Sequence, residues 1–218
     1  MFKLRKWIIL ASFILFIAPI STINAHPHIL IDAQIKFNLN QSKITQLSSL
    51  TYIWQFDENF SLLLLGDYDD NKDQLLSVDE LTTLAIETME ASKELGYFTH
   101  LVKNDTEINL KEITKIDAKF EDSRLTFEFT LELPEPVTID DKLKFAIYDE
   151  EYYTAFNLAE KPSLQLVGDN VTGCSIIRTQ QAEVDENIEN ALKNAFGLDT
   201  VNQGFGAKFA EFVGIKCI

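Results

Sequence analysis

The chain has 218 residues, of which 34 are acidic and 19 are lysine or arginine, so its formal net charge is −15 at pH 7. This acidity argues against nucleic acid and anionic lipid surfaces as partners, and it favours cations and basic protein surfaces. Nearly half of the residues are apolar, so the chain can bury a sizeable core.

Residues 1–25 have the order of a secretory signal. Basic residues at positions 3, 5 and 6 precede an apolar run at 7–20, and Ala25 ends a short stretch of small residues. We expect cleavage after Ala25, which would raise the net negative charge to about −18. No later segment has the roughly 18 apolar residues that a membrane span needs, so we expect no membrane insertion of the mature chain. Residues 26–218 are expected to form one periplasmic domain.

Alternating apolar residues predict β-strands at 28–39 and 44–56. Asp57 is a candidate N-cap for a short apolar helix at 60–65, and helical spacing resumes at 79–95 before Gly96. The acidic stretch between these helices therefore predicts an EF-hand-like helix-loop-helix, inserted at about 57–95.

The acidic loop has oxygen-bearing residues at the spacing of a calcium-binding loop. The predicted ligands are the side chains of Asp69, Asn71, Asp73, Ser77 and Glu80 and the carbonyl of Leu75. Position six of the loop, usually glycine at positive φ, is Gln74, which favours weak binding. The alternative is a solvated connection whose carboxylates reflect the acidity of the whole chain.

Alternation predicts further strands at 97–102, 108–113, 115–120, 125–133, 143–148, 164–167 and 175–179. Pro134 and Pro136 are expected to end the strand at 125–133. Amphipathic spacing predicts C-terminal helices at 184–196 and 205–213. The predicted class is α+β: a β-rich body, with an immunoglobulin-like sandwich as the leading candidate, plus the inserted helix-loop-helix and the C-terminal helices.

Cleavage after Ala25 would leave His26 at the new N-terminus, two residues before His28. An α-amine, two imidazoles and the remaining histidine, His100, form a candidate transition-metal site for nickel, zinc or copper. Pro27 has no amide proton, so it excludes a site that needs a deprotonated second backbone nitrogen. The alternative is a frayed polar start and a strand histidine with no metal role.

Two further features complete the candidate sites. Residues 148–153 combine tyrosines with acids and could line a pocket, although exposed turn acids between core aromatics are the commoner outcome. Cys174 and Cys217 are the two cysteines, and an exported protein favours a disulfide between them. Two buried thiols or a thiolate metal pair are the alternatives.

Several separated motifs are similar to one known family. They are Ala25-His26-Pro27-His28, residues 52–60, the acidic loop ending in Glu80-Leu81, Gly96 to His100, Tyr148 to Tyr153, and residues 206–210 before Cys217. Together they resemble the bacterial DUF1007 family, described as a periplasmic component of an uncharacterised ABC-type transport system. The resemblance implies a membrane metal transporter or permease as partner, and it implies no catalytic residues.

The preferred hypothesis is a periplasmic metal-binding accessory protein of a metal-ion transport system, with calcium in the acidic loop. A calcium-dependent interaction module without a transition-metal role is the alternative. A copper-dependent enzyme is a second alternative, which we do not favour because the chain has no Gly-x-Ser-x-Gly, His-Glu-x-x-His or phosphate-loop motif.

Overall fold

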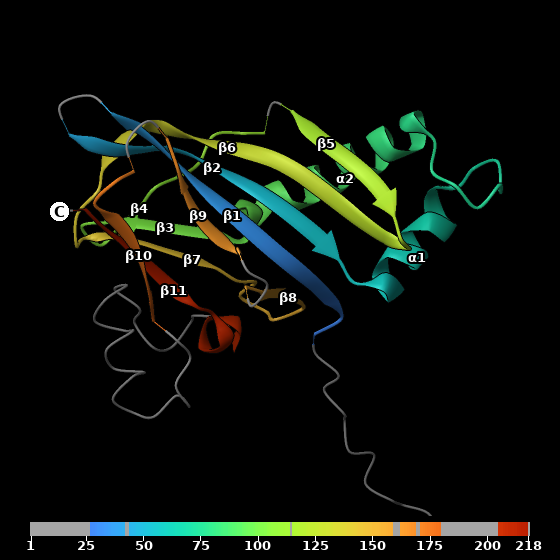
Figure 1. Ribbon diagram of the computed structural model, residues 1–218. Helices are drawn as coiled ribbons and strands as arrows, with labels where there is room; N and C mark the ends of the chain where they lie inside the picture. The colour runs from blue at the N-terminus through green and yellow to red at the C-terminus, as the bar shows by residue number, and fades with distance from the viewer. Residues whose placement is uncertain are drawn as a thin grey trace, which may run out of the picture.

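The computed structural model describes residues 27–41, 44–113, 115–158, 162–168, 171–179 and 205–217. Within these ranges the fold is β-rich, with two sheets and two α-helices (Figure 1). The strands are β1 (Ile29–Gln41), β2 (Thr45–Phe56), β3 (Thr99–Lys103), β4 (Thr106–Glu107), β5 (Ile116–Glu121), β6 (Arg124–Thr138), β7 (Leu143–Ile147), β8 (Thr154–Asn157), β9 (Leu164–Val167), β10 (Cys174–Thr179) and β11 (Phe212–Cys217). The helices are α1 (Glu58–Tyr68) and α2 (Val78–Glu94), with the 3-10 turns η1 (Gly96–Phe98) and η2 (Phe205–Phe209).

The larger sheet has the strand order β5-β6-β2-β1-β8, and β9 also pairs with β1. The long central strand β2 is antiparallel to both of its neighbours, β1 and β6, whereas β8 and β9 run parallel to β1 along the same edge. The smaller sheet has the order β10-β11-β7-β3-β4 and is antiparallel throughout.

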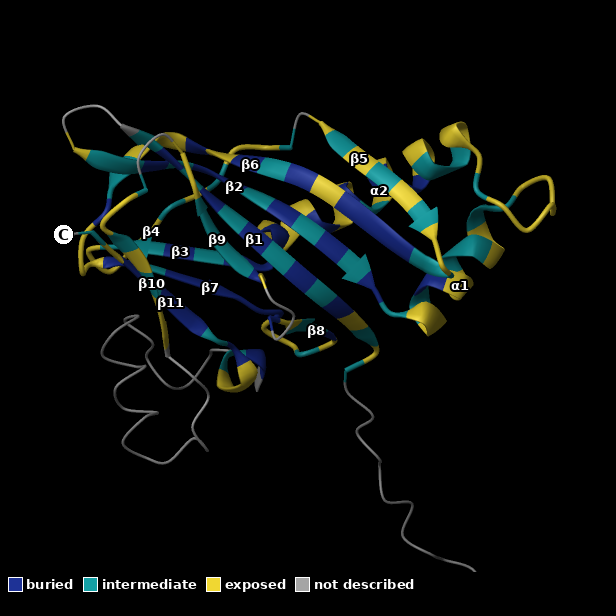
Figure 2. Cartoon of the chain, in the orientation of Figure 1, coloured by how far each residue is buried: buried dark blue, intermediate teal, exposed yellow. Residues whose placement is uncertain are grey.

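Buried and partly exposed residues alternate along β1, β2 and β6, as Figure 2 shows. Because successive side chains point to opposite faces of a strand, one face of the larger sheet points inward. The two sheets meet through aromatic side chains, since the Phe37 ring lies edge-on at 5.2 Å from that of Phe145. The Tyr52 hydroxyl on β2 also lies 2.8 Å from the Thr99 hydroxyl on β3. One main apolar core therefore joins the sheets.

The two helices cover the larger sheet where the smaller sheet does not. Helix α2 packs against β5 and runs behind the sheet in Figure 1, and α1 packs against β6. Leu84, Ala85 and Met89 of α2 belong to the main core. The expected inserted EF-hand is therefore wrong as a description of the fold, because each helix is part of the cover of the sheet.

The predicted α+β class is also wrong in two other parts, although its β-rich body is confirmed. An immunoglobulin-like sandwich is built from antiparallel sheets, whereas β8 and β9 are parallel to β1. The helix expected at 205–213 is η2 followed by β11, whose Phe212, Val213 and Ile215 are buried by pairing with β7 and β10. The helix expected at 184–196 lies outside the described residues.

Strand β6 continues through Pro134 and Pro136, where a break was expected. Its register with β2 shifts there: Glu132 lies opposite Ser49, but Val137 lies opposite Leu47. Proline is tolerated at such an irregularity because no ladder hydrogen bond needs its missing N–H. Residues 108–113, expected as a strand, form no regular element, and the strand expected at 97–102 begins only at Thr99, after η1.

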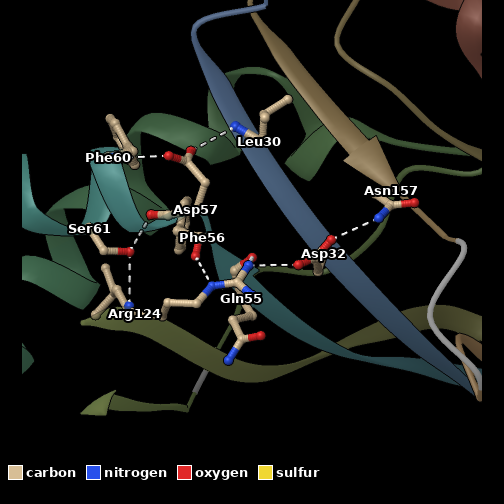
Figure 3. Close-up of polar contacts among 10 residues, drawn as sticks. Leu30, Asp32, Gln55, Phe56, Asp57, Phe60, Ser61, Arg124 and Asn157 are labelled. Carbon is tan, nitrogen blue, oxygen red and sulfur yellow. Dashed lines mark hydrogen bonds and ion pairs between the residues drawn. The ribbon is translucent and has the colours of Figure 1, made fainter. Parts of the chain in front are cut away.

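The start of α1 is held by hydrogen bonds to two strands (Figure 3). The Asp57 carboxylate accepts from the backbone N–H of Phe60 at 3.1 Å, which confirms it as the N-cap, and from that of Leu30 on β1, also at 3.1 Å. The Ser61 hydroxyl donates to the Asp57 carbonyl and accepts from the N–H of Leu125 on β6. The first turn of α1 is thereby attached to β1 and β6.

Arg124 completes this network from β6 (Figure 3). Its Nε donates to the Phe56 carbonyl at 2.8 Å, and its Nη2 donates to the Asp32 carboxylate at 2.6 Å and to the Gln55 carbonyl at 3.4 Å. The Asn157 amide of β8 donates to the same carboxylate at 2.8 Å. The last two carbonyls of β2 are thus bound to a guanidinium that is itself paired with β1.

The predicted disulfide is confirmed between Cys174 and Cys217, which lie opposite each other on β10 and β11. It closes a loop with a sequence separation of 43 residues and attaches the C-terminal strand to its neighbour.

Replacing both cysteines by serine should lower the free energy of unfolding by about 2–4 kcal/mol, because the unfolded chain regains the entropy of the open loop. Urea unfolding of the variant and of the oxidised wild type measures the difference. Wild type treated with a reductant is the matched control and should unfold like the variant. Equal stability of all three samples would contradict a stabilising role.

Candidate functional site

A cavity of about 920 Å³ lies where β1, β2, both helices, β3 and residues 148–154 come together. Its apolar walls come from inward positions of the larger sheet and from the segments that cover it. These wall residues are Ile29, Ile31, Trp54, Phe56, Phe60, Leu95 and Phe98. The volume is in the range of a small-molecule site.

Trp54 is the largest side chain of the wall and is only 1% exposed. Its indole ring lies 6.1 Å from the Phe98 ring and 5.4 Å from the Phe156 ring, measured between centroids. Its Nε1–H is buried and has no hydrogen-bond acceptor among the described residues. A buried donor without an acceptor is uncommon in folded proteins and costs free energy.

The opening of the cavity is acidic. We define the acidic rim as the five exposed lining residues Glu87, Glu94, Glu107, Glu150 and Glu151. Within the part of the chain that the structure describes, no lysine or arginine lines the cavity. The rim therefore attracts cations and repels anions.

Residues 148–154 form one side of the opening, and the buried carboxylate of Asp149 fixes their shape. Its two oxygens accept from the backbone N–H groups of Glu151, at 3.0 Å, and Thr154, at 2.9 Å. Gly206 packs against this turn so closely that a Cβ atom there would lie 1.7 Å from the Asp149 carbonyl oxygen. Only glycine fits this position, and it brings η2 against the 148–154 segment.

His100 lies at the opening, at the start of β3. Its ring stacks on Tyr148 with centroids 3.8 Å apart, and its Nε2 lies 3.3 Å from the Tyr148 carbonyl oxygen. Its Nδ1 lies 3.8 Å from a carboxylate oxygen of Glu107. Burial lowers the pKa of His100 below its usual 6.5, against the opposing effects of the Tyr148 carbonyl, Glu107 and Glu150. The imidazole is therefore neutral at pH 7, which is the form that binds metals.

Tyr148 is kept in its neutral form by the same surroundings. Burial, and then the charges of Glu150 and Glu107, raise the pKa of its phenol to about 12. Both carboxylates thus act on the Tyr148 ring as well as on the stacked His100 ring, so these four side chains form one electrostatic unit at the opening.

The other predicted metal ligands are only partly described. His28 donates its backbone N–H to the Tyr153 carbonyl at 2.8 Å, and its ring lies 4.7 Å from the Tyr153 ring. His28 and His100 therefore contact two tyrosines of the same 148–154 segment. His26 lies outside the described residues, and within those residues no three histidine, cysteine, aspartate or glutamate side chains are grouped closely enough to hold a metal ion. The three-histidine site stays a prediction.

The predicted calcium loop connects α1 and α2 at an exposed end of the molecule (Figure 1). The Asp69 carboxylate accepts from the N–H groups of Asp73 and Gln74, at 3.1 and 2.8 Å. The Glu80 carboxylate accepts from the N–H groups of Asp70 and Ser77, at 2.9 and 2.8 Å. Gln74 takes the left-handed conformation, with φ 66°, that usually favours glycine.

The remaining predicted ligands lie in the same turn. The Asn71 side chain accepts from the Asp73 N–H at 2.8 Å, the Ser77 hydroxyl caps α2, and Leu75 is 67% exposed. The loop is therefore closed by its own carboxylates, and calcium ligation by these residues stays a prediction.

The sequence analysis found part of the cavity and missed the rest. The 148–153 cluster was a candidate for a pocket and lines the cavity, as does His100. The apolar wall and the α2 carboxylates Glu87 and Glu94 were missed, because nothing in local spacing distinguishes a wall residue from a core or surface residue. Trp54 and Phe56 alternate along β2 like any inward pair.

A family described as a protein of unknown function (DUF1007) matches residues 11–217. The chain belongs to this family. The match covers both sheets, the cavity and the disulfide, and it assigns no function to them. No curated protein matches the chain. Among the described residues, no helix is long and apolar enough to cross a membrane.

Because its pKa in the folded protein is lowered, His100 binds protons less readily than it does in the unfolded chain. The unfolded state therefore gains protons first as the pH falls below 6.5, and stability should fall with it. We expect the melting temperature of the wild type to fall more steeply between pH 7 and pH 5 than that of His100→Gln.

Thermal unfolding across that pH range measures this difference. Parallel curves for the wild type and His100→Gln would show that protonation of His100 is not linked to folding.

Proposed function

We propose that this protein is an exported metal-binding accessory protein of a metal-ion transport system. In this proposal, a transition metal such as nickel, zinc or copper binds at the cavity opening through His100. The N-terminal residues His26 and His28 supply further nitrogen ligands. The observation that carries the proposal is the neutral imidazole of His100 beside Glu107, in an opening that no described lysine or arginine lines.

The donor chemistry of the opening suits a divalent transition metal. Neutral imidazole is the commonest protein ligand for such ions, and a carboxylate beside it either joins the ligands or orients the ring. The backbone N–H of His28 donates to the Tyr153 carbonyl, and its ring lies 4.7 Å from that of Tyr153, which lines the same cavity. Export after cleavage at Ala25 would make the His26 amine available.

The transport role rests on the family resemblance more than on geometry. A membrane transporter or permease is the proposed partner, and the strong negative charge of the chain suits a basic docking surface on it. The role is one of binding, since the sequence contains none of the catalytic motifs considered above.

Calorimetric titration of the exported protein with nickel, zinc and copper tests the metal site. His100→Gln should weaken the tightest of these interactions at least about ten-fold, as loss of a ligand or of its support typically does. His28→Gln should weaken it as well if the N-terminal nitrogens take part.

Glu132→Gln serves as the control, because it removes an exposed charge on β6 that does not line the cavity. It should bind metal like the wild type. Unchanged affinity after replacement of His26, His28 and His100 together would exclude the proposed site.

A calcium-dependent interaction module is the second candidate function. The observation that favours it is Gln74, which holds the left-handed conformation that a calcium loop needs at its sixth position without the help of glycine. The carboxylates of Asp69 and Glu80 already face the inside of the same turn, as their bonds to its backbone indicate.

Calcium should raise the melting temperature of the wild type but not that of Glu80→Gln, which loses the bidentate ligand. Asp79→Asn is the matched control, because Asp79 is an acid in the first turn of α2 but not a predicted ligand. It should keep the calcium response. Equal shifts for all three proteins would rule out calcium in this loop.

A further inference from the structure

We propose that two copies of this chain associate by antiparallel pairing of strand β5, which extends the larger sheet across a two-fold axis. Strand β5 is the outermost strand of that sheet (Figure 1). It pairs with β6 on one side, and among the described residues no strand pairs with its other side. An unpaired strand edge is a template for a strand of another chain. The proposal does not depend on metal binding.

The backbone groups of three β5 residues point toward this open edge. Glu121 of β5 lies opposite Arg124 of β6 across a two-residue turn whose residues both have positive φ, so the two form a hydrogen-bonded pair. Backbone groups alternate in direction along an antiparallel ladder, so every second residue counted back from Glu121 faces β6. The residues between them face outward, and these are Ile116, Ala118 and Phe120.

Helix α2 covers the inner face of β5 and not its edge. The side chains of Ile116, Ala118 and Phe120 are partly buried and pack against the main core. Helix α2 packs against β5 and lies behind the sheet in Figure 1. The side chains between these three residues are exposed, so burial alternates along β5 in Figure 2. The position beside β5 in the plane of the sheet therefore remains open to another strand.

The exposed side chains of this segment are alternately basic and acidic. They are Lys115, directly before β5, and Asp117, Lys119 and Glu121. When two copies pair antiparallel with Ala118 at the centre, Asp117 lies opposite the partner's Lys119. In the same arrangement, Lys115 lies opposite the partner's Glu121. Opposite charges that face each other across a ladder stabilise the pairing, so the segment is complementary to a second copy of itself.

The same register also satisfies the backbone. Ala118 lies opposite its own counterpart, and Ile116 lies opposite the partner's Phe120, so the residues with outward backbone groups form the hydrogen-bonded pairs. The charged residues occupy the intervening pairs, in which opposite side chains come closer together.

Ion pairs within one molecule do not prevent these contacts. Lys115 pairs with Asp117 and Lys119 pairs with Glu121 along the strand, each at 2.9 Å. Both ion pairs are exposed and therefore weak, so each lysine can also bind a carboxylate of the second copy. Asp117 also lies opposite Glu128 of β6, and a lysine on its other side would offset this like-charge contact.

The order of the charges disfavours neighbouring registers. A shift of two residues in one direction places Asp117 opposite the partner's Asp117, and a shift in the other direction places Lys119 opposite the partner's Lys119. Like charges directly opposite each other destabilise a ladder. Residues 115–121 carry no net charge although the chain carries −15, so the segment itself does not repel a second copy.

Sedimentation equilibrium of the exported protein tests the proposal, with EDTA present so that the outcome is independent of any metal. We expect a reversible equilibrium between monomer and dimer with a dissociation constant in the micromolar range, as befits a small interface. Added salt should weaken the dimer, because exposed charge pairs are screened.

Lys119→Glu and Asp117→Lys should each weaken the dimer at least about ten-fold, since each places like charges opposite one another on both sides of the two-fold axis. An equimolar mixture of the two variants should associate about as tightly as the wild type. In the mixed dimer, each altered residue again lies opposite a residue of the other charge.

Lys216→Glu is the matched control, because it makes the same change in charge at an exposed position of β11 in the other sheet. It should dimerise like the wild type, and it should not restore association when mixed with Asp117→Lys. Three results would each overturn the proposal. They are a wild type that stays monomeric up to the millimolar range, equal weakening by Lys119→Glu and Lys216→Glu, and no association in the mixture of the two β5 variants. The first result decides the matter without any variant.

Discussion

The guanidinium of Arg124 holds together the part of the molecule on which the cavity depends. It binds the final carbonyls of β2 and the Asp32 carboxylate near the start of β1, and so joins the end of one strand to the beginning of the other. Asp57 then starts α1 directly after β2. As a result, Phe56 at the end of the strand and Phe60 in the first turn of the helix both contribute to the cavity wall.

The cavity combines two environments that come from different parts of the fold. Its wall is the inward face of the larger sheet, where alternation along β1 and β2 places apolar side chains. Its opening comes from α2, β4 and the 148–154 segment, all of which contribute carboxylates. A cationic group can therefore remain beside charge and water while an attached apolar group is buried.

The proposed metal ion needs only the donors at the opening of the cavity, where burial keeps the imidazole of His100 neutral.

Strands and helices with strong local periodicity were predictable from the sequence: β1, β2, α2 and the N-cap at Asp57 all lie close to where the pattern places them. Elements whose structure depends on pairing with strands distant in the sequence were not predictable in this way. Strand β6 passes two prolines because its register with β2 shifts at that point, and β11 is a strand because β7 and β10 lie on either side of it.

In the candidate site too, the residues that form a local pattern were predictable, and those brought together by the fold were not. The aromatic and acidic cluster at 148–153 is contiguous in the sequence and was recognisable as a pocket candidate. That the buried Trp54 nitrogen has no acceptor among the described residues is visible only in the packed structure. The carboxylates of α2 reach the opening only because the helix covers the larger sheet.

The unpaired edge of a long strand such as β1 is a site where a strand of another copy can add to the sheet. This 13-residue strand pairs with β2 on one side, and on the other side β8 pairs with Ile29–Asp32 and β9 pairs with Ile35–Asn38. Both covering strands come late in the sequence, so a chain whose N-terminal half folds first offers a long unpaired backbone to any neighbouring copy. Once the C-terminal half has folded, these two four-residue strands occupy most of that edge, which leaves little backbone for a strand of another copy to pair with.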